Sequence, residues 1–91
     1  ENLPKILILR LHLVTAMDAT ALNALESVVE RLQKHGSAVI LSGLQHQPLT
    51  MLHKAGLIKV IGRENLVANF DDALDRARDV LKEMKEPPPE G

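Results

Sequence analysis

A nearly all-aliphatic run, PKILILRLHLV at residues 4–14, constrains the fold more than any other part of the sequence. Its apolar residues fall on both alternating sets: Leu7, Leu9, Leu11 and Leu13 on one side, and Ile6, Ile8 and Val14 on the other, together with Arg10 and His12. Successive side chains of a strand point to opposite faces of its sheet. A strand that is apolar on both faces is typical of the buried centre of a largely parallel sheet. The run therefore predicts a central strand, with Pro4 suited to its start because proline cannot donate a ladder hydrogen bond.

The rest of the chain alternates between helical and extended patterns. Residues 18–35 carry an apolar stripe at helical spacing, and Gly36 can adopt the left-handed conformation that ends a helix. Residues 46–56 and 71–85 are predicted helices, whereas the short apolar runs 37–43 and 57–62 are predicted strands. Residues 63–69 are a predicted connection with at most a brief extended piece. The predicted stripes are Leu22, Leu25, Val29 and Leu32 in the first helix, and Leu74, Ala77, Leu81 and Met84 in the last.

This order, β-α-β-α-β-α, predicts an α/β fold with a mostly parallel sheet and right-handed crossovers. Ninety-one residues make one small domain at most. We expect the domain to span residues 1–86, and the proline-rich residues 87–91 to be a disordered tail. The first strand is predicted to be central although no strand precedes it. We therefore expect that one or two N-terminal strands are missing from this chain or are supplied by a partner.

The composition excludes several classes of function. Eleven Lys and Arg residues against twelve Asp and Glu give a net charge of −1 without a block of either sign, and Phe70 is the only aromatic residue. Nucleic acid is therefore not an expected partner, because its binding needs basic patches or base-stacking side chains. The chain has no cysteine, which excludes disulfides and thiol catalysis. Its apolar runs are far shorter than the ~20 residues that cross a bilayer, so the chain is expected to be soluble as it stands.

The sequence contains no pattern typical of an active site or a metal centre. His46 and His53 are seven residues apart and could share a helix face, but no third ligand follows at metal spacing. His12 is expected to find a backbone partner near a strand end, and His35 to act as a helix C-terminal cation. The glycines match neither phosphate-binding loop pattern. We therefore expect no metal, no cofactor and no enzymatic activity.

The turn between the first strand and the first helix is the candidate site. It contains Asp18 and Thr20, two residues apart, in the stretch MDATALNAL at residues 17–25. Either side chain could cap the helix by accepting a hydrogen bond from its first turn, which typically contributes ~1 kcal/mol. The carboxyl edge of a parallel sheet is also where such folds present ligand and switch groups. A phosphate on Thr20 would lie near a helix N-terminus but would be repelled by Asp18. Capping and function therefore both remain open for this turn.

Taken together, residues 4–45 and the later stretch AGLIKVIGRENLVANFDDALDRA resemble a STAS domain (sulfate transporter and anti-sigma factor antagonist). The strand at residues 5–10, the turn at residues 18–20 and FDDAL at residues 70–74 are most similar to the C-terminal cytoplasmic domain of SulP-type sulfate and anion permeases. That resemblance implies a non-catalytic regulatory and protein-interaction domain at the cytoplasmic face of the inner membrane. Its implied partners are a membrane-embedded transporter domain in the same polypeptide and a cytoplasmic protein, with a homodimer left open.

The resemblance also implies a site and an alternative function. In anti-sigma factor antagonists a Ser or Thr at this turn is phosphorylated by a partner kinase, which places Thr20 at the phospho-acceptor position and Asp18 beside it. The regulatory turn would comprise Asp18, Ala19, Thr20 and Ala21. The family usually has glycine where Ala21 stands, so Ala21 departs from the pattern. The alternatives are thus a transporter domain, a free-standing antagonist switched at Thr20, and a small α/β binding domain with another partner.

Overall fold

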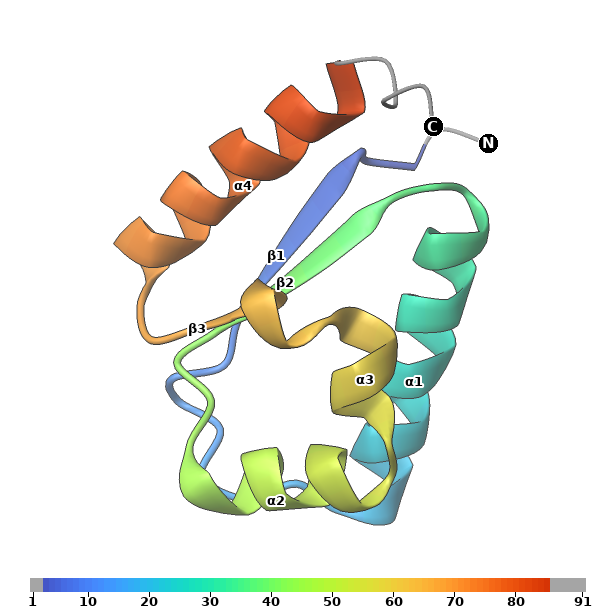
Figure 1. Ribbon diagram of the computed structural model, residues 1–91. Helices are drawn as coiled ribbons and strands as arrows, with labels where there is room; N and C mark the ends of the chain where they lie inside the picture. The colour runs from blue at the N-terminus through green and yellow to red at the C-terminus, as the bar shows by residue number, and fades with distance from the viewer. Residues whose placement is uncertain (1–2, 86–91) are drawn as a thin grey trace.

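The computed structural model describes residues 3–85 and shows three layers, with helices on both faces of a parallel sheet (Figure 1). The elements, in chain order, are β1 (Ile6–Arg10), α1 (Ala19–Lys34), β2 (Ala38–Ser42), α2 (His46–Lys54), α3 (Leu57–Ile61), the 3-10 helix η1 (Arg63–Asn65), β3 (Leu66–Val67) and α4 (Phe70–Lys85). The predicted fold class is confirmed.

The described strands form one parallel sheet in the order β1-β2-β3. Ile8 lies opposite Ile40 in the first pair of strands, and Leu41 lies opposite Leu66 in the second. The central strand of this part of the sheet is β2, whose three middle residues are almost fully buried. The strand β1 pairs only with β2 among the described residues, and its first four residues are half-buried. Its unpaired edge and partly covered faces agree with the prediction that the intact domain has further strands.

The sheet separates two apolar layers. On one face, α1, α2 and α3 enclose a cluster of buried residues: Val29, Leu32, Val39, Leu41, Leu52, Leu57 and Ile61. The opposite face is covered by α4, whose buried residues are Ala73 and Val80 (Figure 1). Ile40 is fully buried but does not belong to the first cluster, as expected from the alternation of side chains along β2.

The predicted strand at 4–14 is too long. The last ladder bond runs from the Leu11 N–H to the Ser42 carbonyl, and the Val14 N–H then donates to the Leu11 carbonyl in a tight turn. That turn carries Leu13 out of the sheet, where 81% of its surface is exposed. The alternating leucines therefore follow the geometry of the strand only as far as Leu11.

The predicted strand at 57–62 is wrong, because residues Leu57–Ile61 form the helix α3. Leu57 and Ile61 are buried four residues apart, as helical geometry allows. The flanking Gly56 and Gly62 have φ of 75° and 100°, so the chain can turn sharply at each end of this single turn. The third strand instead lies at Leu66–Val67, within the predicted connection.

The helices predicted at 18–35, 46–56 and 71–85 are confirmed within two residues at each end. In α1 the apolar stripe packs as predicted. In α4 the buried side is rotated from the predicted stripe: Ala73 and Val80 are buried, whereas Leu81 and Met84 are 36% and 41% exposed. The predicted tail at 87–91 lies outside the described residues.

Candidate functional site

The turn before α1 is a helix cap, as one of the two open interpretations predicts. Asp18 has extended backbone geometry, and its Oδ1 accepts a hydrogen bond of 2.8 Å from the Ala21 N–H. Its carbonyl oxygen accepts the first helical bond, from the Leu22 N–H at 3.0 Å. Asp18, rather than Thr20, is therefore the capping residue.

The other residues of the predicted regulatory turn lie in the first turn of α1. Ala19, Thr20 and Ala21 are all exposed. In the described part of the chain the Thr20 hydroxyl makes no hydrogen bond, so its side chain is not needed for the cap. Exposure and a free hydroxyl are what a phospho-acceptor or a docking residue requires, and the helix N-terminus adds a positive partial charge that favours an anion.

The turn is held in place by Gln47 at the start of α2. The Gln47 Oε1 accepts a hydrogen bond of 2.7 Å from the Met17 N–H, and its Nε2 donates to the Met17 carbonyl at 3.1 Å. Met17 is buried and immediately precedes Asp18. Because one side-chain amide fixes both backbone polar groups of one residue, the start of α1 is positioned by a residue thirty positions away.

A second anchor holds the loop between β1 and α1. The Gln45 Nε2 donates to the His12 carbonyl at 2.6 Å. The prediction that His12 finds a backbone partner is wrong for its side chain, because the imidazole is exposed and makes no hydrogen bond within residues 3–85. The loop also passes so close to Gly43 that a Cβ there would lie 2.9 Å from the His12 Cβ. Gly43 has a φ of +72°, so both the close approach and the backbone conformation require glycine.

The four histidines do not form one cluster, although His46 and His53 line a common hollow. His35 is the C-cap of α1, with its Nδ1 3.1 Å from the Arg31 carbonyl, while His46 and His53 lie on α2. Within residues 3–85, no group of three or more His, Cys, Asp or Glu side chains could hold a metal ion. The same residues contain no helix that is both long and apolar enough to cross a membrane.

Sequence reasoning identified the cap but missed the residues that position it. The sequence predicts no role for Gln45 and only a place at the start of a helix for Gln47, because a glutamine that bonds to a distant backbone group carries no periodic signal. The sequence offers one indirect sign: two glutamines flank a histidine, two residues after Gly43 and just before Pro48.

Comparisons with known proteins found similarity both in sequence and in structure. The STAS domain family model matches residues 1–75. The "Putative sulfate transporter YvdB" of Bacillus subtilis (strain 168) is 36% identical over 72 residues, which cover 79% of this chain but only 14% of that protein. The chain therefore spans about one seventh of the length of this curated relative.

Two solved structures share the fold. A sulfate transporter family protein from Wolinella succinogenes matches with a TM-score of 0.82 and 33% identity, over 90% of this chain and 67% of that one. The STAS domain of a SulP transporter from Vibrio cholerae matches with a TM-score of 0.81 and 35% identity, over 91% of this chain and 65% of that one. Because the family model covers most of the chain and both structures reproduce its layers, this chain belongs to the STAS domain family.

Proposed function

We propose that the chain is the cytoplasmic regulatory and protein-interaction domain of a SulP-type sulfate or anion transporter, and that it catalyses no reaction itself. The observation that carries the proposal is the match to the Vibrio cholerae SulP transporter STAS domain, at 35% identity over 91% of the chain. The much greater length of YvdB fits a membrane-embedded transporter domain in the same polypeptide. The domain would then lie at the cytoplasmic face of the inner membrane.

The proposed contact surface is the turn Asp18–Ala21 with the first turn of α1. These residues are exposed, yet the Gln47 bonds to Met17 and the Asp18 cap hold their backbone in one conformation. A surface that is already ordered loses little conformational entropy when a partner binds, so more of the contact energy appears as affinity. The turn is therefore suited to docking on the transporter domain or on a cytoplasmic protein.

The test is made in the full-length transporter, by measuring sulfate uptake into cells and the amount of protein in the membrane. Thr20→Val removes the hydroxyl with little change in shape, and Asp18→Asn removes the charge while keeping a good N-cap residue. We expect both variants to change uptake per transporter, with membrane levels and thermal stability close to wild type.

Thr15→Val is the matched control, because Thr15 is exposed in the loop just before this turn. It should leave uptake unchanged. If Thr20→Val and Asp18→Asn transport as Thr15→Val does, the turn is only a helix cap and the proposed contact surface is wrong.

A second candidate function is a free-standing anti-sigma factor antagonist switched at Thr20. The observation that favours it is the exposed Thr20 hydroxyl at a helix N-terminus. Incubation with its partner kinase and ATP should add one phosphate to the wild type and none to Thr20→Val, as read by mass spectrometry. An unmodified mass, under conditions in which the kinase modifies a known substrate, would contradict this function.

A further inference from the structure

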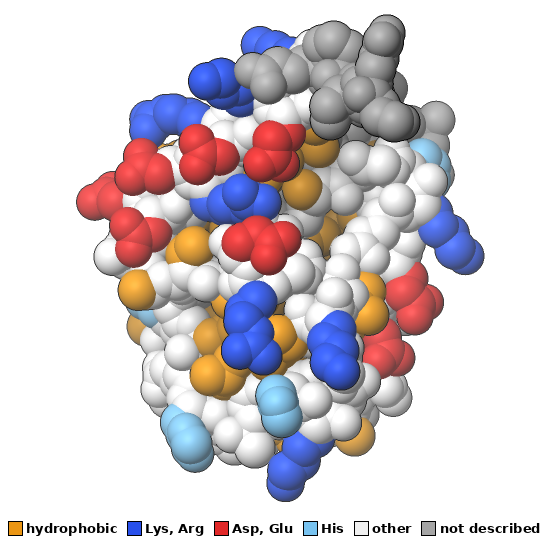
Figure 2. Space-filling model, in the orientation of Figure 1, with side chains coloured by type: hydrophobic (Ala, Val, Ile, Leu, Met, Phe, Trp, Pro, Cys, Tyr) orange, Lys and Arg blue, Asp and Glu red, His pale blue; other side chains and the backbone are white. Residues whose placement is uncertain are grey.

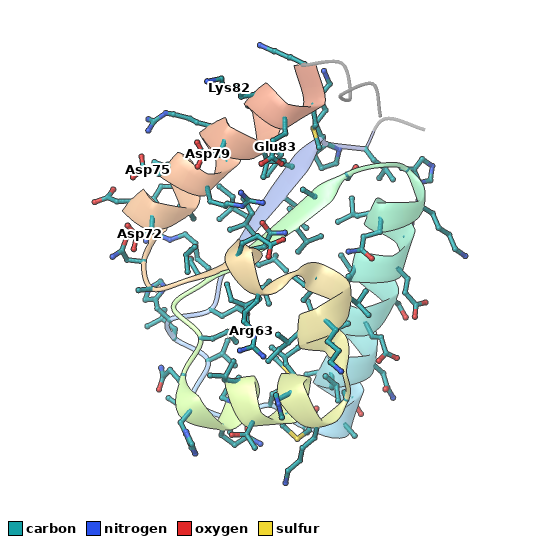
Figure 3. All side chains as sticks on the ribbon, in the orientation of Figure 1. Arg63, Asp72, Asp75, Asp79, Lys82 and Glu83 are labelled. Carbon is teal, nitrogen blue, oxygen red and sulfur yellow. The ribbon has the colours of Figure 1, made fainter. Side chains whose placement is uncertain are left out.

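The charges of the chain are segregated along its sequence. Residues 31–63 contain no Asp or Glu, but they contain five Lys or Arg residues and three histidines. The helix α4 instead carries an acidic row, of which Asp72, Asp75, Asp79 and Glu83 are labelled in Figure 3. Figure 2 shows acidic side chains gathered over α4 at the upper left, interspersed with Lys and Arg, and further acidic side chains at the right edge; in the lower half, Lys, Arg and His side chains surround an apolar hollow. The net charge of −1 therefore conceals a locally cationic surface.

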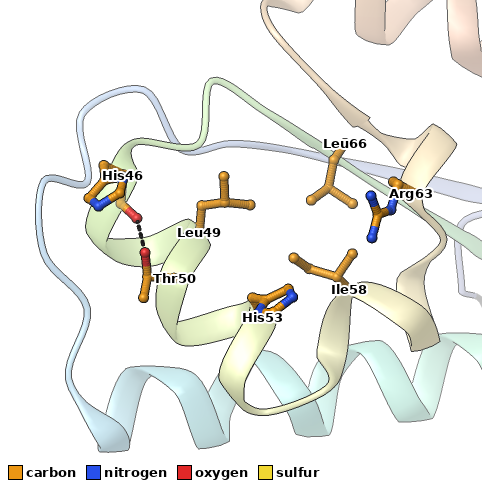
Figure 4. Close-up of a pocket in the computed structure, with 7 residues that line it drawn as sticks. All are labelled: His46, Leu49, Thr50, His53, Ile58, Arg63 and Leu66. Carbon is orange, nitrogen blue, oxygen red and sulfur yellow. Dashed lines mark hydrogen bonds between the residues drawn. The ribbon is translucent and has the colours of Figure 1, made fainter.

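The apolar hollow lies where α2, α3 and η1 meet the β3 edge of the sheet (Figure 4). Its volume is about 490 Å³, within the usual range for small-molecule sites in proteins. Leu49, Ile58 and Leu66 form its apolar wall, and they come from three different elements. The hollow shares no lining residue with the turn Asp18–Ala21.

Three polar side chains of the hollow have no hydrogen-bond partner within residues 3–85. Arg63 and the imidazoles of His46 and His53 line it. Within residues 3–85 the Arg63 guanidinium forms no hydrogen bond or ion pair, and neither imidazole forms one. Among the described residues no carboxylate lines the hollow, so no acidic side chain of that part of the chain neutralises Arg63 in its wall.

Neighbouring lysines strengthen this charge. A smaller hollow of about 200 Å³ adjoins the first through His53, Ile58 and Arg63, and it adds Lys54 and Lys59 to the cationic side. Thr50, by contrast, uses its hydroxyl hydrogen internally, in a bond of 2.9 Å to the His46 carbonyl (Figure 4). The donors that remain for a ligand are therefore cationic or imidazole groups.

We propose that this hollow binds an organic anion, with its carboxylate or phosphate at Arg63 and His53 and its apolar body against Leu49, Ile58 and Leu66. The charged group is required because an uncompensated guanidinium gains most from a charge-assisted, bidentate partner. The apolar body is required because an inorganic anion would leave the aliphatic wall in contact with water. This site is independent of the proposed docking turn and would add a ligand-responsive element to the domain.

The binding test uses the full-length polypeptide and a diazirine-bearing analogue of octanoic acid as a photo-crosslinking probe. After irradiation and digestion, mass spectrometry locates the labelled peptide. We expect labelling within residues 46–66, competition by octanoate, and far weaker competition by 1-octanol or sodium sulfate, each of which supplies only half of the proposed chemistry.

Variants distinguish specific labelling of the hollow from non-specific labelling of the surface. Arg63→Gln should reduce labelling at 46–66 at least tenfold, because the anion loses its strongest partner. The matched control is Arg78→Gln on α4, since Arg78 is exposed and paired with Asp75 at 2.9 Å; it should label as the wild type does. Leu49→Asn, at a partly exposed wall residue, should weaken labelling without disturbing the core.

The same experiment distinguishes the source of the anion. Stronger competition by phosphatidylglycerol vesicles than by free octanoate, with none by phosphatidylcholine vesicles, would assign the site to an anionic lipid; competition by octanoate and by neither kind of vesicle would assign it to a free small molecule. Labelling outside 46–66, equal labelling of Arg63→Gln and Arg78→Gln, or equal competition by octanol and octanoate would overturn the proposal. All three outcomes leave the proposed role of the turn untouched, because they do not involve Asp18–Ala21.

Discussion

Removing the Gln47 side-chain amide should loosen the start of α1. Gln47→Met keeps the length and flexibility of the side chain but loses both bonds to Met17, of 2.7 and 3.1 Å. A net 0.5–1.5 kcal/mol per bond gives a loss of about 1–3 kcal/mol in the free energy of unfolding. The value should be near the middle of that range, about 2 kcal/mol, because Met17 is buried and its freed N–H is not fully hydrated. In a domain of this size the melting temperature should fall by roughly 8–16 °C.

Chemical denaturation measures this loss, and Gln33→Met is the matched control. The Gln33 side chain also reaches a distant backbone group, donating to the Val60 carbonyl at 2.6 Å, but it makes a single exposed bond. Its loss should cost only about 0.5 kcal/mol. Gln47→Glu should fall between the two variants, because its carboxylate can still accept from the Met17 N–H but cannot donate to the Met17 carbonyl.

The local consequence can be measured independently. Amide hydrogen exchange at Met17 should accelerate in Gln47→Met more than exchange in β2 does, since the clamp acts on the loop before α1. Equal destabilisation by Gln47→Met and Gln33→Met, with unchanged exchange at Met17, would refute the inference that Gln47 positions the candidate site.

Three further outcomes are expected from denaturation measurements. Gly43→Ala should lower the free energy of unfolding by about 3 kcal/mol, since a left-handed conformation and a 2.9 Å approach to His12 both oppose the added methyl group. At Gly36 an added Cβ meets no atom within 4 Å, so Gly36→Ala should cost only about 1 kcal/mol. Similar losses for the two variants would contradict the steric argument. Leu52→Ala should cost about 2–5 kcal/mol because Leu52 is fully buried, whereas an equal loss for the exposed Leu13→Ala would disprove the assigned core. Asp18→Ala should cost about 1 kcal/mol and Asp18→Asn almost nothing; equal losses would show that charge, not capping, matters there.

The parts of the fold that local signals specify were predictable. Gly36 and the stripe ending at Leu32 define the end of α1, and the alternation around Ile8 gives the correct faces of β1. The run at 57–62 was not predictable in the same way, because Leu57, Ile58, Val60 and Ile61 fit a short buried strand and a single helical turn equally well. The segment is helical because Leu57 and Ile61 pack against the core. No local sequence pattern contains that information.

In the candidate site, too, the local contacts were predictable from the sequence and the long-range contacts were not. The Asp18 cap joins atoms three residues apart, so the sequence contains it. The bonds from Gln47 to Met17, and the hollow that Arg63 lines together with His46 and His53, bring together segments that are distant in the chain. Such contacts depend on how α2 and η1 pack, and a single sequence gives no direct sign of them.

The two-sided burial of β2 has a consequence for synthesis of the chain. Once residues up to Ile61 have left the ribosome, α1, α2 and α3 can cover the Val39 and Leu41 side of the sheet. The Ile40 side has no cover until α4, ending at Lys85, has also emerged. During that interval the nascent domain exposes an apolar strand surface of the kind that chaperones bind and that promotes aggregation. The sixteen residues of α4 must therefore be synthesised before the apolar surface around Ile40 is covered and the risk of misassembly falls.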